Sequence, residues 1–115
     1  MSPTEAALDR VTRIPGVRGV LLVTGSDGLV VAEQLMDGVD GRAAAALTAS
    51  LVGRLSRAAQ SAGMRPPAFV LLRGDAGSVL AAPAAVDLVL VAVVGPDANV
   101  GLARLEMIEA AGRLD

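Results

Sequence analysis

Short apolar runs that end at glycine, proline or aspartate constrain the fold of this chain more than any other sequence feature. Runs of this length between turn residues are typical of β-strands. The segments Gly25-Ser26-Asp27-Gly28 and Gly74-Asp75-Ala76-Gly77 each join two consecutive runs, as hairpin turns do. We therefore expect the neighbouring strands to be antiparallel. The predicted strands are Val17–Val23, Leu29–Gln34, Ala68–Arg73, Ser78–Ala82 and Leu88–Val94.

Three other segments have helical patterns. The longest runs from about Arg42 to Ala62, with Asp40 before it as a candidate N-cap and Gly63 after it as a plausible stop. The resulting order α-β-β-α-β-β-β-α predicts an α+β fold, with a single five-stranded antiparallel sheet flanked by helices and one domain over residues 1–115. The other predicted helices are Thr4–Arg13, with Thr4 as a possible cap, and a last helix from Asp97 or Asn99 to about Gly112.

The long helix carries more apolar surface than contact with one sheet requires. Leu47, Leu51 and Leu55 lie on one stripe, which we expect to pack on the chain's own sheet. Small residues extend the non-polar arc to ~200°, whereas a surface helix needs ~100°. This small flank could pack against a helix of a second copy, or alanine could simply be abundant on an exposed surface. The flank consists of Ala45, Ala49, Val52 and Ser56.

The third strand is the second candidate contact between copies. A sheet edge offers unpaired backbone N–H and C=O groups, which an identical strand across a two-fold axis can satisfy. Phe69, the only aromatic residue, could anchor such a contact or could belong to the core, and both interpretations stay open. The sequence therefore predicts a homodimer interface that includes Phe69 and Leu71 beside the small flank.

The chain lacks the residue types on which most catalysis depends. It has no His, Cys, Tyr, Trp or Lys. General acid–base catalysis near neutral pH, covalent catalysis and thiolate or imidazole metal sites usually recruit these side chains. Asp37 and Asp40 are interpreted as a solvated loop residue and a helix cap rather than as a cation site. We expect no enzymatic activity, no cofactor and no metal, although an enzyme acting through carboxylates alone stays formally possible.

Charge and hydropathy restrict the classes of binding partner and the cellular compartment that we expect for this chain. The formal charge is −2 and the pI is about 5.0, and no basic cluster or aromatic platform suits nucleic acid. Arg54 and Arg57 could meet an acidic patch on a partner, although exposed charges are usually only solvated. No signal-peptide pattern is present, and no window reaches the roughly 18 apolar residues of a membrane span. We therefore expect a cytoplasmic protein without membrane insertion.

Several local strings resemble the Roadblock/dynein-light-chain family in its bacterial, MglB-like form. The resemblance covers nearly the whole chain, and it depends on the order and spacing of four segments rather than on one motif. The segments are Ile14 to Val23 with Ser26 to Ala32, the Ala-rich helix from Ala43, the meander Phe69 to Val94, and Gly95-Pro96-Asp97-Ala98-Asn99-Val100-Gly101-Leu102.

This resemblance implies a Roadblock/profilin-like sandwich that forms dimers. In the family, the long helices of two copies pack together and the third strands pair into a ten-stranded sheet. Members act as regulatory or scaffold subunits in motor complexes or beside small Ras-like GTPases, and some stimulate GTP hydrolysis, for which an arginine finger is the usual device. Nothing marks one of the ten arginines as such a finger. We expect a non-catalytic, homodimeric interaction module, with a small-molecule-binding sensor as the alternative.

Overall fold

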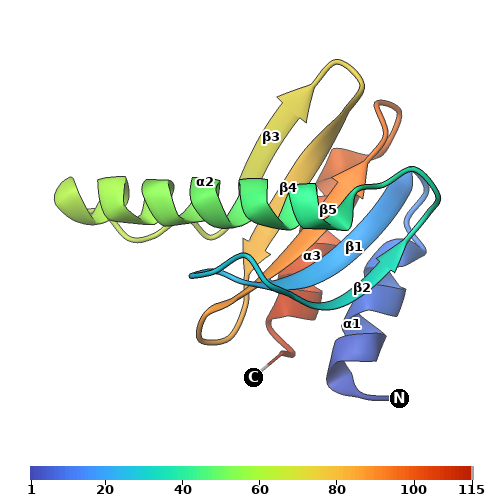
Figure 1. The fold of residues 1–115 in the computed structure, drawn as a ribbon, viewed down its shortest axis with the longest axis horizontal. Coiled ribbons are helices and arrows are strands. Elements are labelled where there is room, and N and C mark those ends of the chain that lie inside the picture. Colours follow the sequence, from blue (N-terminus) through green and yellow to red (C-terminus); the bar gives the residue numbers. More distant parts are fainter. Residues whose placement is uncertain (115) are drawn as a thin grey trace.

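Eight elements follow one another in the order α-β-β-α-β-β-β-α in the computed structural model, which describes residues 1–114 (Figure 1). This order confirms the predicted fold class. The third strand begins two residues later than predicted, because the polypeptide stays irregular after Pro66-Pro67. The elements are α1 (Pro3–Thr12), β1 (Val17–Thr24), β2 (Val30–Leu35), α2 (Gly41–Ser61), β3 (Val70–Gly74), β4 (Gly77–Pro83), β5 (Leu88–Val94) and α3 (Val100–Ala111).

The five strands form one antiparallel sheet in the order β2-β1-β5-β4-β3. The first and last strands of the chain, β1 and β5, therefore pair at its centre, whereas β2 and β3 form its two edges. In the centre, Leu21 lies opposite Val91 and Leu22 lies opposite Leu90. Both central strands are apolar along nearly their whole length, as expected for strands that are covered on both faces.

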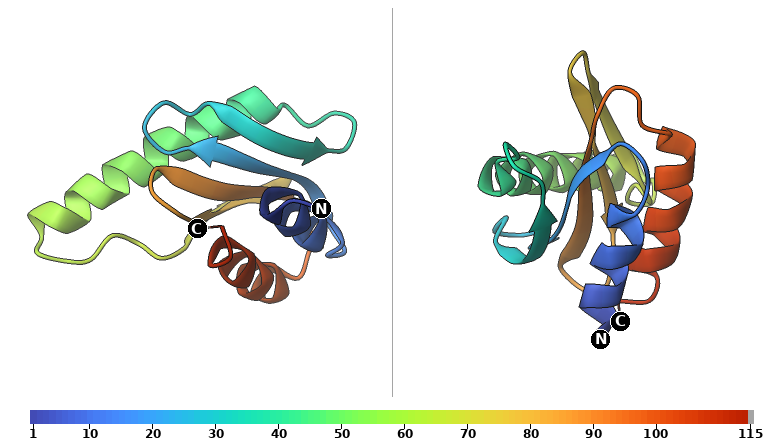
Figure 2. Two further views of the ribbon diagram at one scale, coloured as in Figure 1. Left: turned by 90° about the horizontal axis from the view of Figure 1, so that it is seen from below. Right: turned by 90° about the vertical axis from the view of Figure 1, so that its right-hand side faces the viewer.

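Helices cover both faces of the sheet, as Figure 2 shows: α1 and α3 lie on one face and α2 lies on the other. Successive residues of a strand point to opposite faces, so β1 supplies both cores. Val20 and Leu22 are buried with α1 and α3, whereas Leu21 and Val23 are buried with α2. The continuous apolar run in β1 thus reflects two cores rather than one.

Side-chain caps set the helix ends. Asp40 caps α2 as predicted, with its carboxylate accepting a hydrogen bond of 3.0 Å from the Ala43 N–H. Gly63 has φ of +72° and follows α2, in agreement with its predicted role. For α1, the prediction of Thr4 was wrong, because Ser2 accepts the hydrogen bond from the Glu5 N–H. Of the two candidates for α3, the cap is Asn99.

Gly16 joins α1 to β1 where the chain passes close to the segment before α3. Its φ is +90°, and a Cβ atom built on it would lie 2.6 Å from the Ala98 Cβ atom. Gly38 has nearly the same φ, +88°, but a Cβ atom there would meet nothing within 4 Å. The two positions therefore separate the cost of the backbone conformation from the cost of the steric contact.

We predict that Gly38→Ala lowers the free energy of unfolding by about 1–2 kcal/mol, the cost of a left-handed conformation for a residue with a side chain. Gly16→Ala should lower it by about 1–3 kcal/mol more, because the added methyl group forces apart the two segments. Urea unfolding of both variants and the wild type measures the difference. Equal destabilisation of the two variants would contradict the tight contact at Ala98.

Candidate interaction surface

Helix α2 is only partly supported by the sheet. Its buried residues stop at Val52, and from residue 53 to residue 61 no residue of the helix is buried. Figure 1 shows this second half extending beyond the edge of the sheet. A helical segment as short as residues 53–61 is only marginally stable in water on its own. A further contact could therefore stabilise this exposed half of α2.

The side of α2 that faces the sheet is not the one expected. Ala45 is 0% exposed and packs with Leu21 and Val91 in the core under α2, whereas Leu47 is 46% exposed. The prediction that the leucine stripe packs on the chain's own sheet was therefore wrong. The inner surface of the sheet is already filled by bulky side chains, so small residues on α2 give the closest approach of helix to sheet.

The side of α2 that faces the sheet decides which residues of the predicted interface remain accessible to a second copy. Ala45 and Val52, at 0% and 8% exposure, are covered by the chain's own sheet and leave almost no surface for a second copy. Ala49 and Ser56 are half-buried beside them. On the other flank, Leu51 is half-buried and Leu55 is 39% exposed. The leucine stripe, rather than the small flank, is the apolar surface that α2 presents outward.

The leucine stripe is continuous with the part of the sheet that α2 leaves uncovered. One hollow, of about 370 Å³, has Leu47, Val79 and Val93 in its lining. A second, of about 500 Å³, has Leu72 with the same two valines. The two valines, together with Arg18, line both hollows and so join α2 to β3 in one mostly apolar surface, whose apolar part we call the Leu face. It consists of Leu47, Leu51, Leu55, Leu72, Val79 and Val93.

Strand β3 is an edge strand beside the Leu face. Among residues 1–114 it pairs only with β4, so one side of its backbone has no strand partner. Leu72 lies opposite Val79 on the side of α2, while Leu71 lies opposite Leu80, which belongs to the core under α1 and α3. Leu71 is 40% exposed.

Phe69 lies just before β3 rather than within it. It is half-buried and packs against the core under α1 and α3. The Arg104 guanidinium lies 5.7 Å from the centroid of its ring, within the range of a cation–π contact. Of the two interpretations left open for Phe69, the structure therefore supports a role in packing within the chain.

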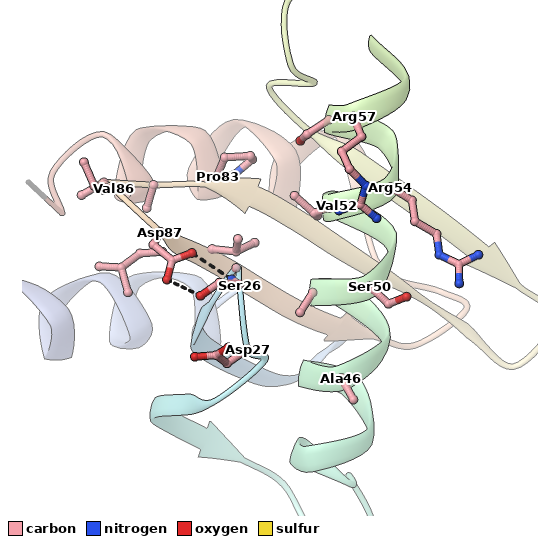
Figure 3. A pocket seen from close by; sticks show the side chains of 18 residues that line it. Ser26, Asp27, Ala46, Ser50, Val52, Arg54, Arg57, Pro83, Val86 and Asp87 are labelled. Carbon is pink, nitrogen blue, oxygen red and sulfur yellow. Dashed lines mark hydrogen bonds between the residues drawn. The ribbon is translucent and has the colours of Figure 1, made fainter. Parts of the chain in front are cut away.

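A third hollow, a cleft of about 870 Å³, lies along the other flank of α2 (Figure 3). The β1–β2 and β4–β5 turns form one wall, and they are tied together by Asp87. The Asp87 carboxylate accepts hydrogen bonds from the Ser26 N–H at 2.8 Å and the Ser26 hydroxyl at 2.7 Å. Asp87 is also the only non-glycine residue with positive φ within residues 1–114, at 59°. The wall is thus held by a specific side chain.

The α2 wall of this cleft is made of small side chains. Ala49, Ser50 and Gly53 line it, and Arg54 and Arg57 stand on the exposed extension of the helix, as Figure 3 shows. Both arginines are exposed, and their role in a partner surface stays a prediction. In the part of the chain that the structure describes, no three potential metal-ligating side chains come together and no helix could span a membrane.

Comparison with protein families agrees with this architecture. A sequence model of the Roadblock/LC7 domain matches residues 3–94. Two proteins of Methanocaldococcus jannaschii, MJ0714 and MJ0310, are each 32% identical to the chain. The matches cover 96% of this chain and 95% of each relative.

Solved structures with the same fold include two MglB proteins. Myxococcus xanthus MglB superposes with a TM-score of 0.83 at 24% identity, covering 95% of this chain and 89% of MglB. The gliding protein MglB of Thermus thermophilus has a TM-score of 0.84 at 21% identity, covering 99% and 89%. A Roadblock/LC7 domain of Streptomyces avermitilis has a TM-score of 0.78 at 22% identity, covering 90% and 86%. With the domain match over most of its length, the chain belongs to the Roadblock/LC7 family.

Proposed function

We propose that this protein is a non-catalytic homodimer whose two-chain surface regulates or scaffolds a small Ras-like GTPase in the cytoplasm. The family is one of regulatory and adaptor domains, which supports the general class. The observation that carries the dimer is the continuity of the exposed Leu face with the free edge of β3. An apolar surface beside an unpaired strand can be satisfied by a second copy of the same surface.

In the proposed dimer, the β3 strands of two copies pair edge to edge and extend the sheet. The Leu faces then pack against each other across the two-fold axis, with the α2 helices side by side. Each leucine that becomes fully buried contributes about 1.5–3 kcal/mol, less the part already buried in the monomer. The contact also supports the second half of α2, which has no buried residue within its own chain.

This arrangement replaces part of the interface predicted from the sequence. Ala45 and Val52 stabilise the monomer instead, because they pack on its own sheet. Ala49 and Ser56 line the cleft on the flank opposite Leu47. Leu71 remains a proposed interface residue, since β3 is the edge strand and this side chain is exposed.

We predict that Leu47→Glu converts the two-chain particle into a single chain of 11.5 kDa, because the dimer would have to bury an unpaired carboxylate. The residue is 46% exposed, so the fold of each chain should survive. Ala46→Glu is the matched control, because Ala46 is exposed on the cleft flank of the same helix. Light scattering at micromolar concentration measures the masses. A dimer that persists in Leu47→Glu but dissociates in Ala46→Glu would place the interface on the other flank.

A Ras-like GTPase is the proposed partner because the fold is shared with MglB proteins and the sequence resembles the family members that act beside such GTPases. A partner of this kind brings its own nucleotide and phosphate-binding loop, so the chemistry does not require the side chains that this chain lacks. The chain would contribute surface and charge. Arg54 and Arg57 stand on the exposed extension of α2 and line the cleft, where they could meet an acidic partner.

The partner proposal predicts that the tagged protein captures a P-loop GTPase from its source organism. The purified pair should bind more tightly when the GTPase holds GTP than when it holds GDP. The combined variant Arg54→Ala and Arg57→Ala should weaken binding by about tenfold, mostly through slower association. The isolated chain should neither bind nor hydrolyse GTP. Nucleotide turnover by the chain alone, or capture of no nucleotide-binding protein, would contradict the proposal.

A small-molecule sensor is the alternative function, and the cleft of about 870 Å³ is the observation that favours it. Its volume falls within the range of ligand pockets, roughly 300–1,000 Å³. The composition of the lining argues against a small-molecule ligand, because no aromatic residue lines the cleft. A cleft that is bordered by two turns and by the small side chains of a helix suits a segment of a protein better than a small ligand.

A further inference from the structure

A glycine interrupts the middle of α2 at the cleft. Gly53 lines the cleft, although glycine is among the least favourable residues in a helix interior. Apart from the helix's own backbone, the nearest atom to a Cβ atom built at Gly53 is the Arg57 Nη1 atom, at 3.3 Å. The space that a side chain at this position would occupy is therefore the space beside which the Arg57 guanidinium lies.

The Arg57 guanidinium has no acidic partner within the described residues 1–114. Helix α2 contains no acidic residue, and neither Arg57 nor Arg54 takes part in an ion pair, whereas Arg10, Arg13 and Arg113 each pair with a carboxylate. Figure 3 shows the Arg57 side chain running back along α2, while Arg54 points away from the two turns. Arg57 is thus the cation of the cleft that a carboxylate from outside the chain could pair with.

The opposite wall of the cleft is fixed by a residue in an unfavourable backbone conformation. Asp87 has φ of 59°, which residues with a side chain rarely adopt and which glycine adopts without cost. In exchange, its carboxylate accepts both hydrogen bonds from Ser26, 61 residues away in the sequence, and its carbonyl accepts one from the Gly25 N–H at 2.9 Å. Backbone strain of this kind is typical of sites that need one defined shape.

The α2 wall leads along a strip of small residues to Arg57. At about 100° per residue, Ser50, Gly53 and Arg57 all lie within about 40° of the direction of Ala46. All four residues line the cleft. The backbone of another polypeptide can approach small side chains closely, so a segment lying along this strip would end at the guanidinium.

The charges around the cleft favour a polypeptide over a polyanion. Asp27 and Asp87 lie on the turn wall, opposite Arg57 on the helix wall. The turn wall would repel a nucleic acid or an anionic lipid surface, which carries negative charge along its whole extent. A protein segment can place a carboxylate at the helix wall and neutral groups at the turn wall.

We propose that the cleft receives an acidic segment of the protein partner, with a carboxylate of the segment paired to Arg57 beside Gly53. Asp87 holds the turn wall in the shape that the rest of the segment contacts. The identity of the partner rests on the proposed function, in which it is a Ras-like GTPase. The cleft lies on the flank of α2 opposite Leu47, so it stays open when the Leu faces of two copies pack together. Arg57 is the anchor of this contact, and Gly53 and Asp87 are positioning residues.

Isothermal titration calorimetry with the purified GTPase that the wild type captures tests the anchor. Arg57→Ala should raise the Kd about tenfold, because the partner's carboxylate loses its cation. Arg54→Ala is the matched control, since it removes the same charge from the same helix on the side that points away from the turns. It should change the Kd by less than about twofold, as expected for a charge outside the centre of a contact.

Gly53→Leu tests the space in the cleft without removing a charge. The added side chain meets only the flexible end of Arg57, and leucine favours a helix, so the chain should stay folded. The Kd should rise about tenfold or more, because the strip along which the segment lies is filled. Ser61→Leu, on the exposed end of α2 and outside the cleft, is the control and should leave the Kd unchanged.

Asp87→Gly separates the shape of the turn wall from the stability of the fold. It removes both hydrogen bonds to Ser26 but relaxes the left-handed backbone, so the midpoint of urea unfolding should move little. The Kd should still rise about fivefold or more, because the wall is no longer held in one arrangement. Asp97→Gly, in the exposed turn before α3, is the control. A loss of stability in Asp87→Gly with an unchanged Kd would show that Asp87 serves only the fold and would overturn its positioning role.

The remaining outcomes separate this site from the proposed function. A GTPase that binds Arg57→Ala and Gly53→Leu as tightly as the wild type overturns the cleft as the binding site and leaves the proposed function standing. Equal weakening by Arg54→Ala and Arg57→Ala would show a diffuse electrostatic contact and would overturn the anchored carboxylate. A wild type that binds no P-loop GTPase removes the proposed function and, with it, the occupant of the cleft.

Discussion

The close approach of α2 to the sheet decides which surfaces this protein presents. Ala44, Ala45 and Val52 meet a sheet face that is filled by Leu21 and Val91. Small side chains on the helix and large ones on the strands give dense packing at a short separation. This contact sets the rotation of α2 about its own axis. The leucine stripe is turned outward on one flank as a result, and the other flank forms a wall of the cleft.

The two edge strands of the sheet, β2 and β3, differ in how readily each could pair with a further strand. Strand β2 includes Glu33 and Gln34, and the register of its pairing with β1 shifts between Leu22 and Val23. Charged residues and irregular pairing are devices that discourage a sheet edge from adding another strand. Strand β3 also has one charged residue, Arg73, but it begins Val-Leu-Leu and keeps regular register with β4 over its whole length. The edge beside the Leu face is thus the one with regular pairing and an apolar run.

The sequence predicted the elements better than it predicted their faces. The caps at Asp40 and Gly63 and the central strand Leu88–Val94 follow from local chemistry, and all three were confirmed. The rotation of α2 does not follow from local chemistry, because a wide apolar arc is compatible with burial of either its leucines or its alanines. Whether the leucines or the alanines are buried depends on the size of the side chains on the strands that face α2. Those side chains are brought together only when β1 pairs with β5 in the folded sheet. The same holds for Phe69, whose partner Arg104 is distant in sequence.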